Sequence, residues 1–161
     1  MQNVHDIEGK NKKQILFEVE LNWLVKKRGI LSASNVNNTL HVATPQEFGG
    51  EGREWSPEHL FLSSISSCFM STYLFFAKRL NFEIGNLECT IIGQVELIDG
   101  KYQFTNIRLF PKIYIANEEL REKANLALAK AQKYCLVTNS IKTDIIYSAE
   151  VVSDMPLQKV V

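Results

Sequence analysis

The most reactive side chains of this 161-residue sequence are those of its three cysteines: Cys68, Cys89 and Cys135. A thiolate is a nucleophile and a metal ligand, and two thiols can be oxidised to a disulfide. The number of cysteines is odd, their spacing is wide and no CxxC occurs, so the pattern indicates neither a secreted disulfide framework nor a zinc site. We therefore expect a cytoplasmic protein with reduced thiols and no bound metal.

Each cysteine also has a purely structural interpretation, because free cysteine is among the most buried residue types. Cys68 lies inside an apolar stretch, Cys135 follows a helical pattern, and Cys89 alternates within a strand pattern. Taken singly, all three are expected to be packed in the core. The histidines are scattered, and we expect them at the surface or in turns: His5, His41 and His59.

The elements that position these thiols follow from hydrophobic periodicity. Apolar residues fill every odd position from Ile15 to Val25, and this period of two predicts a strand. Ser56-Pro57-Glu58 is typical of a helix start, so we predict a helix that contains Cys68 and runs to about Leu80. We expect Asn117 to cap a second helix. Further strands are predicted from about 29, at 39–43, at 87–97 and 102–115 around the turn Asp99-Gly100, and at 142–152.

This order of elements predicts one α+β domain over residues 1–161, with polar residues 1–13 loosely ordered. Lys plus Arg and Asp plus Glu both number 18, so nothing indicates nucleic-acid binding. The most apolar stretch, 60–76, has 17 residues of which six are Ser or Thr. A membrane span needs ~20 mostly apolar residues, so we interpret it as a core helix. Because it is apolar nearly all round, we expect two chains to share the core.

The stretch TPQEFGGEGREWSPEHLFLSSISSCF resembles the signature of the OsmC/Ohr family, the osmotically inducible and organic-hydroperoxide-resistance proteins. The matching features are Gly49-Gly50, Pro57-Glu58 and a cysteine ten residues after the Glu. The segment Cys135-Leu136-Val137-Thr138-Asn139 resembles the family's second-cysteine segment, with Leu136 where many relatives have Pro. The resemblance implies an OsmC-like fold, in which antiparallel sheets wrap two core helices in an intertwined homodimer.

The resemblance also implies a thiol peroxidase without a cofactor, acting on organic hydroperoxides. Cys68 then is the peroxidatic cysteine and Cys135 the resolving one, while an Arg and Glu58 activate the site. Arg28 stands where the family has its Arg, and Arg53 is the rival. Arg28 is otherwise a plain cation in a turn. Relatives suggest a lipoyl-type dithiol as the reductant.

Physical chemistry is consistent with this implication. A thiol of pKa ~8.5 is only a few per cent ionised at neutral pH, and lowering the pKa to ~6 requires about 3.4 kcal/mol of anion stabilisation. A neighbouring guanidinium can supply this stabilisation. After attack on the peroxide, Cys68 is a sulfenic acid, which Cys135 converts to a disulfide.

Ten residues on one straight helix separate Glu58 from Cys68 by ~15 Å. We therefore predict an obligate homodimer in which Glu58 of one chain meets Cys68 of the other. Aromatic residues around the motif predict an apolar pocket that favours alkyl hydroperoxides, although all five are also plausible core residues: Phe48, Trp55, Phe61, Phe69 and Tyr73. Two other functions stay open at this point: a non-catalytic OsmC-like module that binds an apolar small molecule, and a structural domain with packed thiols.

Overall fold

The computed structural model describes residues 14–153. The expectation that residues 1–13 are loosely ordered lies outside the described residues. The chain divides into two compact units, Met1–Ser56 and Pro57–Val161.

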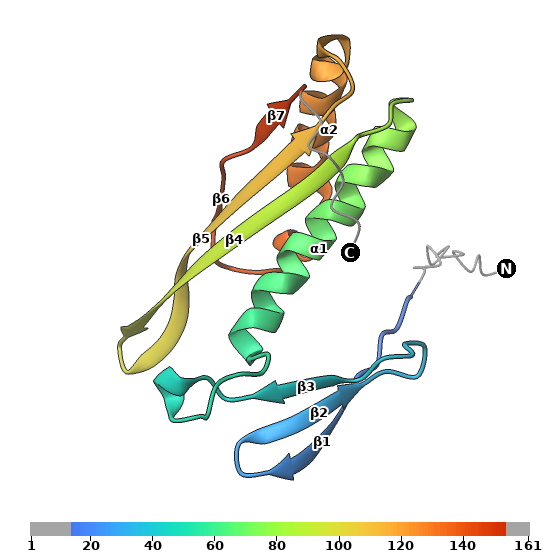
Figure 1. Ribbon diagram of the computed structural model, residues 1–161. Helices are drawn as coiled ribbons and strands as arrows, with labels where there is room; N and C mark the ends of the chain where they lie inside the picture. Colours follow the sequence, from blue (N-terminus) through green and yellow to red (C-terminus); the bar gives the residue numbers. More distant parts are fainter. Residues whose placement is uncertain (1–13, 154–161) are drawn as a thin grey trace, which may run out of the picture. The chain divides into compact units, whose positions relative to one another are not determined.

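The N-terminal unit contains a three-stranded antiparallel sheet, and the strands follow chain order: β1 (Glu20–Val25), β2 (Arg28–Ser32) and β3 (Leu40–Ala43) (Figure 1). The first strand is shorter than the periodicity predicts, because it begins at Glu20 and not at Ile15. In the register of this sheet Glu20 lies opposite Ser32, the last residue of β2. Alternation reports which faces are apolar, but a strand also needs a hydrogen-bonded neighbour, and β2 supplies one only from Glu20 onward.

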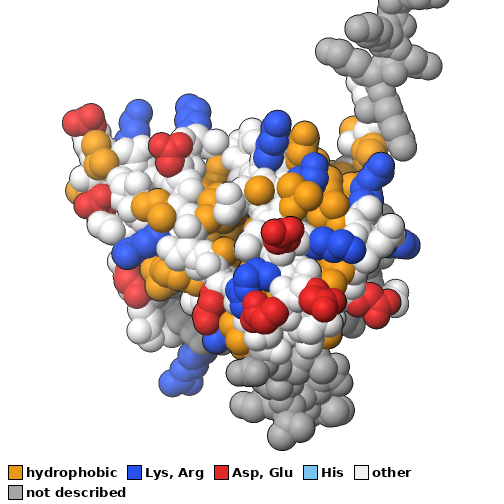
Figure 2. All heavy atoms as spheres, turned by 90° about the horizontal axis from the view of Figure 1, so that it is seen from above, with side chains coloured by type: hydrophobic (Ala, Val, Ile, Leu, Met, Phe, Trp, Pro, Cys, Tyr) orange, Lys and Arg blue, Asp and Glu red, His pale blue; other side chains and the backbone are white. Residues whose placement is uncertain are grey.

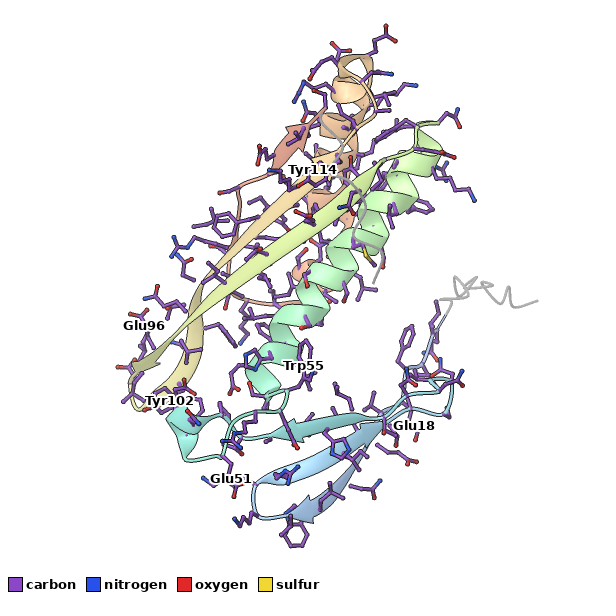
Figure 3. All side chains as sticks on the ribbon, viewed as in Figure 1. Glu18, Glu51, Trp55, Glu96, Tyr102 and Tyr114 are labelled. Carbon is purple, nitrogen blue, oxygen red and sulfur yellow. The ribbon has the colours of Figure 1, made fainter. Side chains whose placement is uncertain are left out.

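The C-terminal unit is built on a long hairpin of β4 (Asn86–Ile98) and β5 (Lys101–Tyr114). The predicted turn is confirmed, since Asp99 and Gly100 both have positive φ, 49° and 75°. Tyr102 lies beside this turn and Tyr114 at the far end of β5 (Figure 3).

The predicted strand over 142–152 is two short strands, β6 (Ile145–Tyr147) and β7 (Glu150–Val152). Both pair with β5 in parallel, so the sheet is mixed and not antiparallel throughout. The break falls at Ser148, whose N–H donates to the Leu109 carbonyl of β5.

Two helices pack with this sheet, α1 (Pro57–Arg79) and α2 (Arg121–Tyr134), and in Figure 1 α1 runs along the β4–β5 hairpin. The start predicted for α1 is confirmed. The second helix opens with a 3₁₀ turn at Glu118–Leu120, and the Asn117 side chain makes no capping hydrogen bond.

The core of the C-terminal unit forms where one stripe of α1 meets α2 and the sheet. The stripe has helical spacing, and Ile65, Phe69 and Tyr73 are 0% exposed. Small residues on α2 let the two helices approach closely. The facing buried residues are Ala124, Ala127, Leu128 and Ala131 on α2 and Ile107, Leu109 and Ile113 on β5.

The opposite side of α1 is not covered by the other described residues of the C-terminal unit, although the apolar sequence predicts broad coverage. Met70, Leu74 and Phe75 are 41%, 41% and 54% exposed. By length and composition alone α1 could cross a membrane, and 22% of its most apolar window is buried in the protein. Core helices of soluble proteins also meet this criterion, so it carries little weight here.

Candidate active site

The packing of α1 on α2 brings two of the three cysteines together. Cys68 lies in the middle of α1, and Cys135 is the residue that ends α2. The two thiols are hydrogen-bonded to each other. Cys68 is half-buried, whereas Cys135 is 0% exposed. Two thiols in contact, one of them accessible, can form a disulfide without large movement of the backbone.

The turn that follows α2 surrounds this pair with backbone amides. At Cys135 the backbone becomes extended and the helix ends, and a 3₁₀ turn begins at Thr138. The first N–H groups of a helical turn lack partners within it, so they are free to face a ligand or a side chain. Here the N–H of Val137 lies 3.5 Å from the Cys68 sulfur and the N–H of Leu136 also faces it. The N–H of Thr138 faces the Cys135 sulfur.

These contacts make the two thiols unequal. Burial of Cys68 opposes its ionisation, but hydrogen bonds from Val137, the Cys135 thiol, Thr72 and Leu136 outweigh burial and lower the pKa of Cys68. Burial and the neighbouring Cys68 sulfur raise the pKa of Cys135, against hydrogen bonds from Thr138. Cys68 is therefore the better nucleophile, and Cys135 stays protonated beside it.

The third cysteine has no such environment. Cys89 packs against the hydrophobic core from β4, and burial raises its pKa to about 11. A thiol in that state is inert at neutral pH.

The two arginines singled out in the sequence belong to the N-terminal unit. Arg28 begins β2 and pairs with the half-buried Glu54, which the sequence analysis did not single out. Hydrogen bonding within the pair raises the pKa of Arg28 and lowers the pKa of Glu54. Arg53, the rival, has a left-handed backbone with φ 71°. No periodicity marks Glu54 in its loop, so only the folded N-terminal unit reveals the pair.

Glu58 lies in the first turn of α1, on the same uninterrupted helix as Cys68. Its Oε2 atom is buried and has no hydrogen-bond partner among residues 14–153. A buried carboxylate oxygen without a donor costs free energy, about 1–3 kcal/mol or more for a charged group. A hydrogen-bond donor to Glu58 Oε2 would therefore lower the free energy of this site.

The Gly-Gly pair of the motif has a local structural reason. Gly49 has φ +74°, in the left-handed region, and a Cβ on Gly50 would lie 1.6 Å from the Thr44 carbonyl oxygen. The loop before α1 can take this path only with glycine at position 50, and the left-handed backbone at position 49 favours glycine.

The aromatic residues expected around the thiols lie partly elsewhere. Phe69 and Tyr73 are fully buried in the core, and Phe61 packs on Phe104 with ring centroids 4.9 Å apart. Phe48 and Trp55 belong to the N-terminal unit. A shallow surface cavity of about 400 Å³, largely open to solvent, lies next to Cys68, because Thr72, which contacts Cys68, also lines it. Its other lining residues are Ser71, Phe75, Phe76 and Tyr134.

The unequal thiols predict a pH profile for alkylation of the reduced protein by iodoacetamide. A lowered pKa means that the Cys68 thiolate is already present at pH values where free cysteine, of pKa ~8.5, is protonated. We expect Cys68 to reach its half-maximal alkylation rate below the midpoint of free cysteine and to lose reactivity only at more acidic pH. Peptide mapping by mass spectrometry after brief labelling measures this, with Cys89 as the internal control that reacts only in alkali. A midpoint for Cys68 at or above that of free cysteine would contradict the assignment.

The protein is an α+β chain with two neighbouring thiols, one in the middle of a long helix and one at the end of a second helix. Comparison with known sequences and structures identifies the family that has this arrangement. The family model described as OsmC-like protein matches residues 50–149. This range includes both thiols, Glu58 and more than half of the chain. The protein belongs to the OsmC-like family.

Individual relatives are distant. The uncharacterized protein YmaD of Bacillus subtilis (strain 168) is 20% identical over 132 residues, which cover 80% of this chain and 88% of YmaD. The OsmC-like protein of Mycoplasma pneumoniae has a TM-score of 0.73 at 15% identity and covers 87% of this chain and 99% of its own. An organic hydroperoxide resistance protein of Elizabethkingia anophelis has a TM-score of 0.69 at 21% identity, with 89% and 99% covered. At these identities the solved structures establish the fold.

Proposed function

We propose that this protein is a thiol-dependent peroxidase that reduces organic hydroperoxides to alcohols. The observation that carries the proposal is the contact between Cys68, whose pKa is lowered, and the fully buried Cys135. A structural pair of cysteines needs no such difference in acidity, whereas a nucleophile and its resolving partner do. Membership of a family that includes organic hydroperoxide resistance proteins supports the same chemistry.

The reaction follows from the positions of the two sulfurs. The Cys68 thiolate attacks the terminal oxygen of the hydroperoxide, the O–O bond breaks, and the alkoxide takes a proton from solvent to leave as an alcohol. Cys68 is now a sulfenic acid. The Cys135 sulfur attacks the Cys68 sulfur, water leaves, and a disulfide forms. An external dithiol reduces the disulfide and is itself oxidised; we propose a lipoyl-type dithiol.

The substrate in this proposal is a hydroperoxide with an apolar tail. The cavity beside Thr72 is lined by two phenylalanines and a tyrosine, and it opens one turn of α1 beyond Cys68. An alkyl or aryl group in this cavity would place its peroxide oxygen near Cys68, whereas hydrogen peroxide has nothing to bury there.

In this proposal Arg28 is the cation that stabilises the alkoxide, and Glu58 is the carboxylate that aims it. Arg28→Ala is expected to slow oxidation of Cys68 by about 10²-fold, the usual cost of losing one donor to a developing oxyanion. Arg53→Ala is the matched control and should leave the rate within about twofold. Quenched-flow trapping of the sulfenic acid measures both rates. Equal losses in the two variants, or no loss in Arg28→Ala, would assign the role elsewhere.

We further propose that residues 1–161 work as one OsmC-like domain of a cytoplasmic homodimer with composite sites. Apolar residues are exposed on α1 and also on β1, where Trp23 is 73% exposed and Leu21 63%. Figure 2 shows hydrophobic side chains between the charged ones on one face of the protein. A second copy would cover such surfaces, and it would supply the donor that Glu58 needs. A monomer in sedimentation equilibrium that still turns over hydroperoxide would refute this part.

Counting free thiols after mixing reduced protein with cumene hydroperoxide tests the function. The enzyme should lose two thiols rapidly, regain them with a dithiol, and react more slowly with hydrogen peroxide. A module that only binds an apolar molecule in the cavity beside Phe75 and Phe76 would lose none or lose them slowly. That outcome, or loss of Cys89 in place of Cys68, would overturn the proposal.

A further inference from the structure

We infer that Thr138 is the positioning residue for the second thiol, Cys135, and that Tyr147 holds the Thr138 hydroxyl in place. This inference rests on the proposed peroxidase function, in which Cys135 must attack the oxidised Cys68. In the sequence, Thr138 is notable only as part of the second-cysteine segment, and nothing marks Tyr147.

The contacts of Thr138 converge on Cys135. The Thr138 hydroxyl donates to the Cys135 carbonyl at 3.1 Å, and the Thr138 N–H faces the Cys135 sulfur. The Asn139 N–H donates to the same carbonyl at 3.1 Å. The turn is therefore closed on Cys135 by two successive residues, which fixes the direction of its side chain.

Tyr147 supports the turn from the sheet. Its hydroxyl lies near the Thr138 side chain. Its backbone pairs with Leu109 in the centre of β5, and its ring lies 6.1 Å from that of the buried Phe69 on α1. Because sheet and helix both hold Tyr147, its hydroxyl is held rigidly beside the Thr138 side chain.

The chemistry requires such support, because Cys135 must lose a proton in a site closed to solvent. Its sulfur then attacks the Cys68 sulfur, the S–O bond breaks, and the departing hydroxide takes up the proton as water. Among the described residues of the C-terminal unit, the titratable groups that interact with the thiol pair are the two cysteines themselves and Tyr147 on β6, and Cys89 on β4 interacts with Tyr147. None of these groups carries a positive charge, so hydrogen-bond donors of this unit matter for the Cys135 anion: the Thr138 N–H faces the sulfur, and the Thr138 hydroxyl, bound to the Cys135 carbonyl, keeps this N–H and the thiol in position.

The donors of the two sulfurs are also different groups. The Cys68 sulfur is stabilised by Leu136, Val137 and Thr72, whereas the Cys135 sulfur is stabilised by Thr138. A change at the Thr138 hydroxyl should therefore affect attack by Cys135 and leave attack by Cys68 unchanged.

Reaction of the reduced protein with Ellman's disulfide separates the two attacks without any hydroperoxide. Cys68 attacks first and releases one thionitrobenzoate, and Cys135 then attacks the mixed disulfide at Cys68 and releases a second. In a Cys89→Ser background, Thr138→Val should slow the second release about tenfold, the effect of about 1.4 kcal/mol lost with the hydrogen bond that holds Cys135 in position, and leave the first within twofold. Thr138→Ser keeps the hydroxyl and should restore the second rate.

The controls make the outcomes distinct. Thr143→Val removes a hydroxyl that donates to the Phe104 carbonyl at 2.9 Å in the same unit, and it should change neither rate. A second release at the parental rate in Thr138→Val, or equal slowing of both releases, would overturn the inference, as would failure of Thr138→Ser to restore the rate.

Tyr147→Phe should slow the second release by a smaller factor, and no slowing would remove Tyr147 from the assignment. If the parental protein releases both equivalents but never reacts with cumene hydroperoxide, the proposed peroxidase function fails while the role of Thr138 is still decided.

Discussion

Cys68→Ser is expected to lose hydroperoxide consumption by about 10³-fold or more, because the variant has no nucleophile that ionises near neutral pH. The amides of Leu136 and Val137 and the Thr72 hydroxyl stabilise a thiolate. They cannot bring a serine hydroxyl within reach of ionisation, since its intrinsic pKa is far higher. The consumption of cumene hydroperoxide, followed with excess dithiol present, measures the loss.

Cys89→Ser is the matched control for this experiment. Cys89 lies in the same unit, also changes from sulfur to oxygen, and faces the core from β4. Its removal should leave hydroperoxide consumption within about twofold and change only stability, as a partly buried substitution does. Undiminished consumption by Cys68→Ser would disprove the mechanism, and loss on Cys89→Ser alone would move the reaction to a different sulfur.

Cys135→Ser is expected to give a different failure, in which the first oxidation survives and turnover stops. Cys68 keeps its backbone donors, so one equivalent of hydroperoxide is still reduced and a sulfenic acid forms. Without a resolving thiol the sulfenic acid persists and is oxidised further to the sulfinic acid. Intact-protein mass spectrometry should show one added oxygen atom and, with excess hydroperoxide, two.

The roles of the two thiols are tested by comparing the products of Cys68→Ser and Cys135→Ser. The parental protein should form a disulfide and add no oxygen under the same conditions, and dimedone should label Cys135→Ser but not Cys68→Ser. A disulfide in Cys135→Ser would make Cys89 the resolving residue. Rapid steady turnover by Cys135→Ser at the parental rate would show that Cys135 has no part in resolution.

Local signals in the sequence predict the elements that carry the site. Ser56-Pro57-Glu58 determines where α1 begins and Asp99-Gly100 where β4 turns into β5, because capping and left-handed turns depend on a few adjacent residues. The periodic pattern from Ile15 predicts the apolar faces but not the beginning of β1, which depends on the length of β2. The split of 142–152 into β6 and β7 depends in the same way on the edge of β5.

By itself, the sequence determined the α+β class, the helix that carries Cys68 and, through its motifs, the family and the candidate pair of cysteines. Only the tertiary structure decided that the two thiols are neighbours, that the amides of Leu136, Val137 and Thr138 face them, and that Arg28 pairs with Glu54. Backbone N–H groups are present at every residue except proline, so their direction leaves no trace in the residue types. Contacts between α1 and the end of α2 join residues far apart in the chain, and the packing that creates them depends on the whole core.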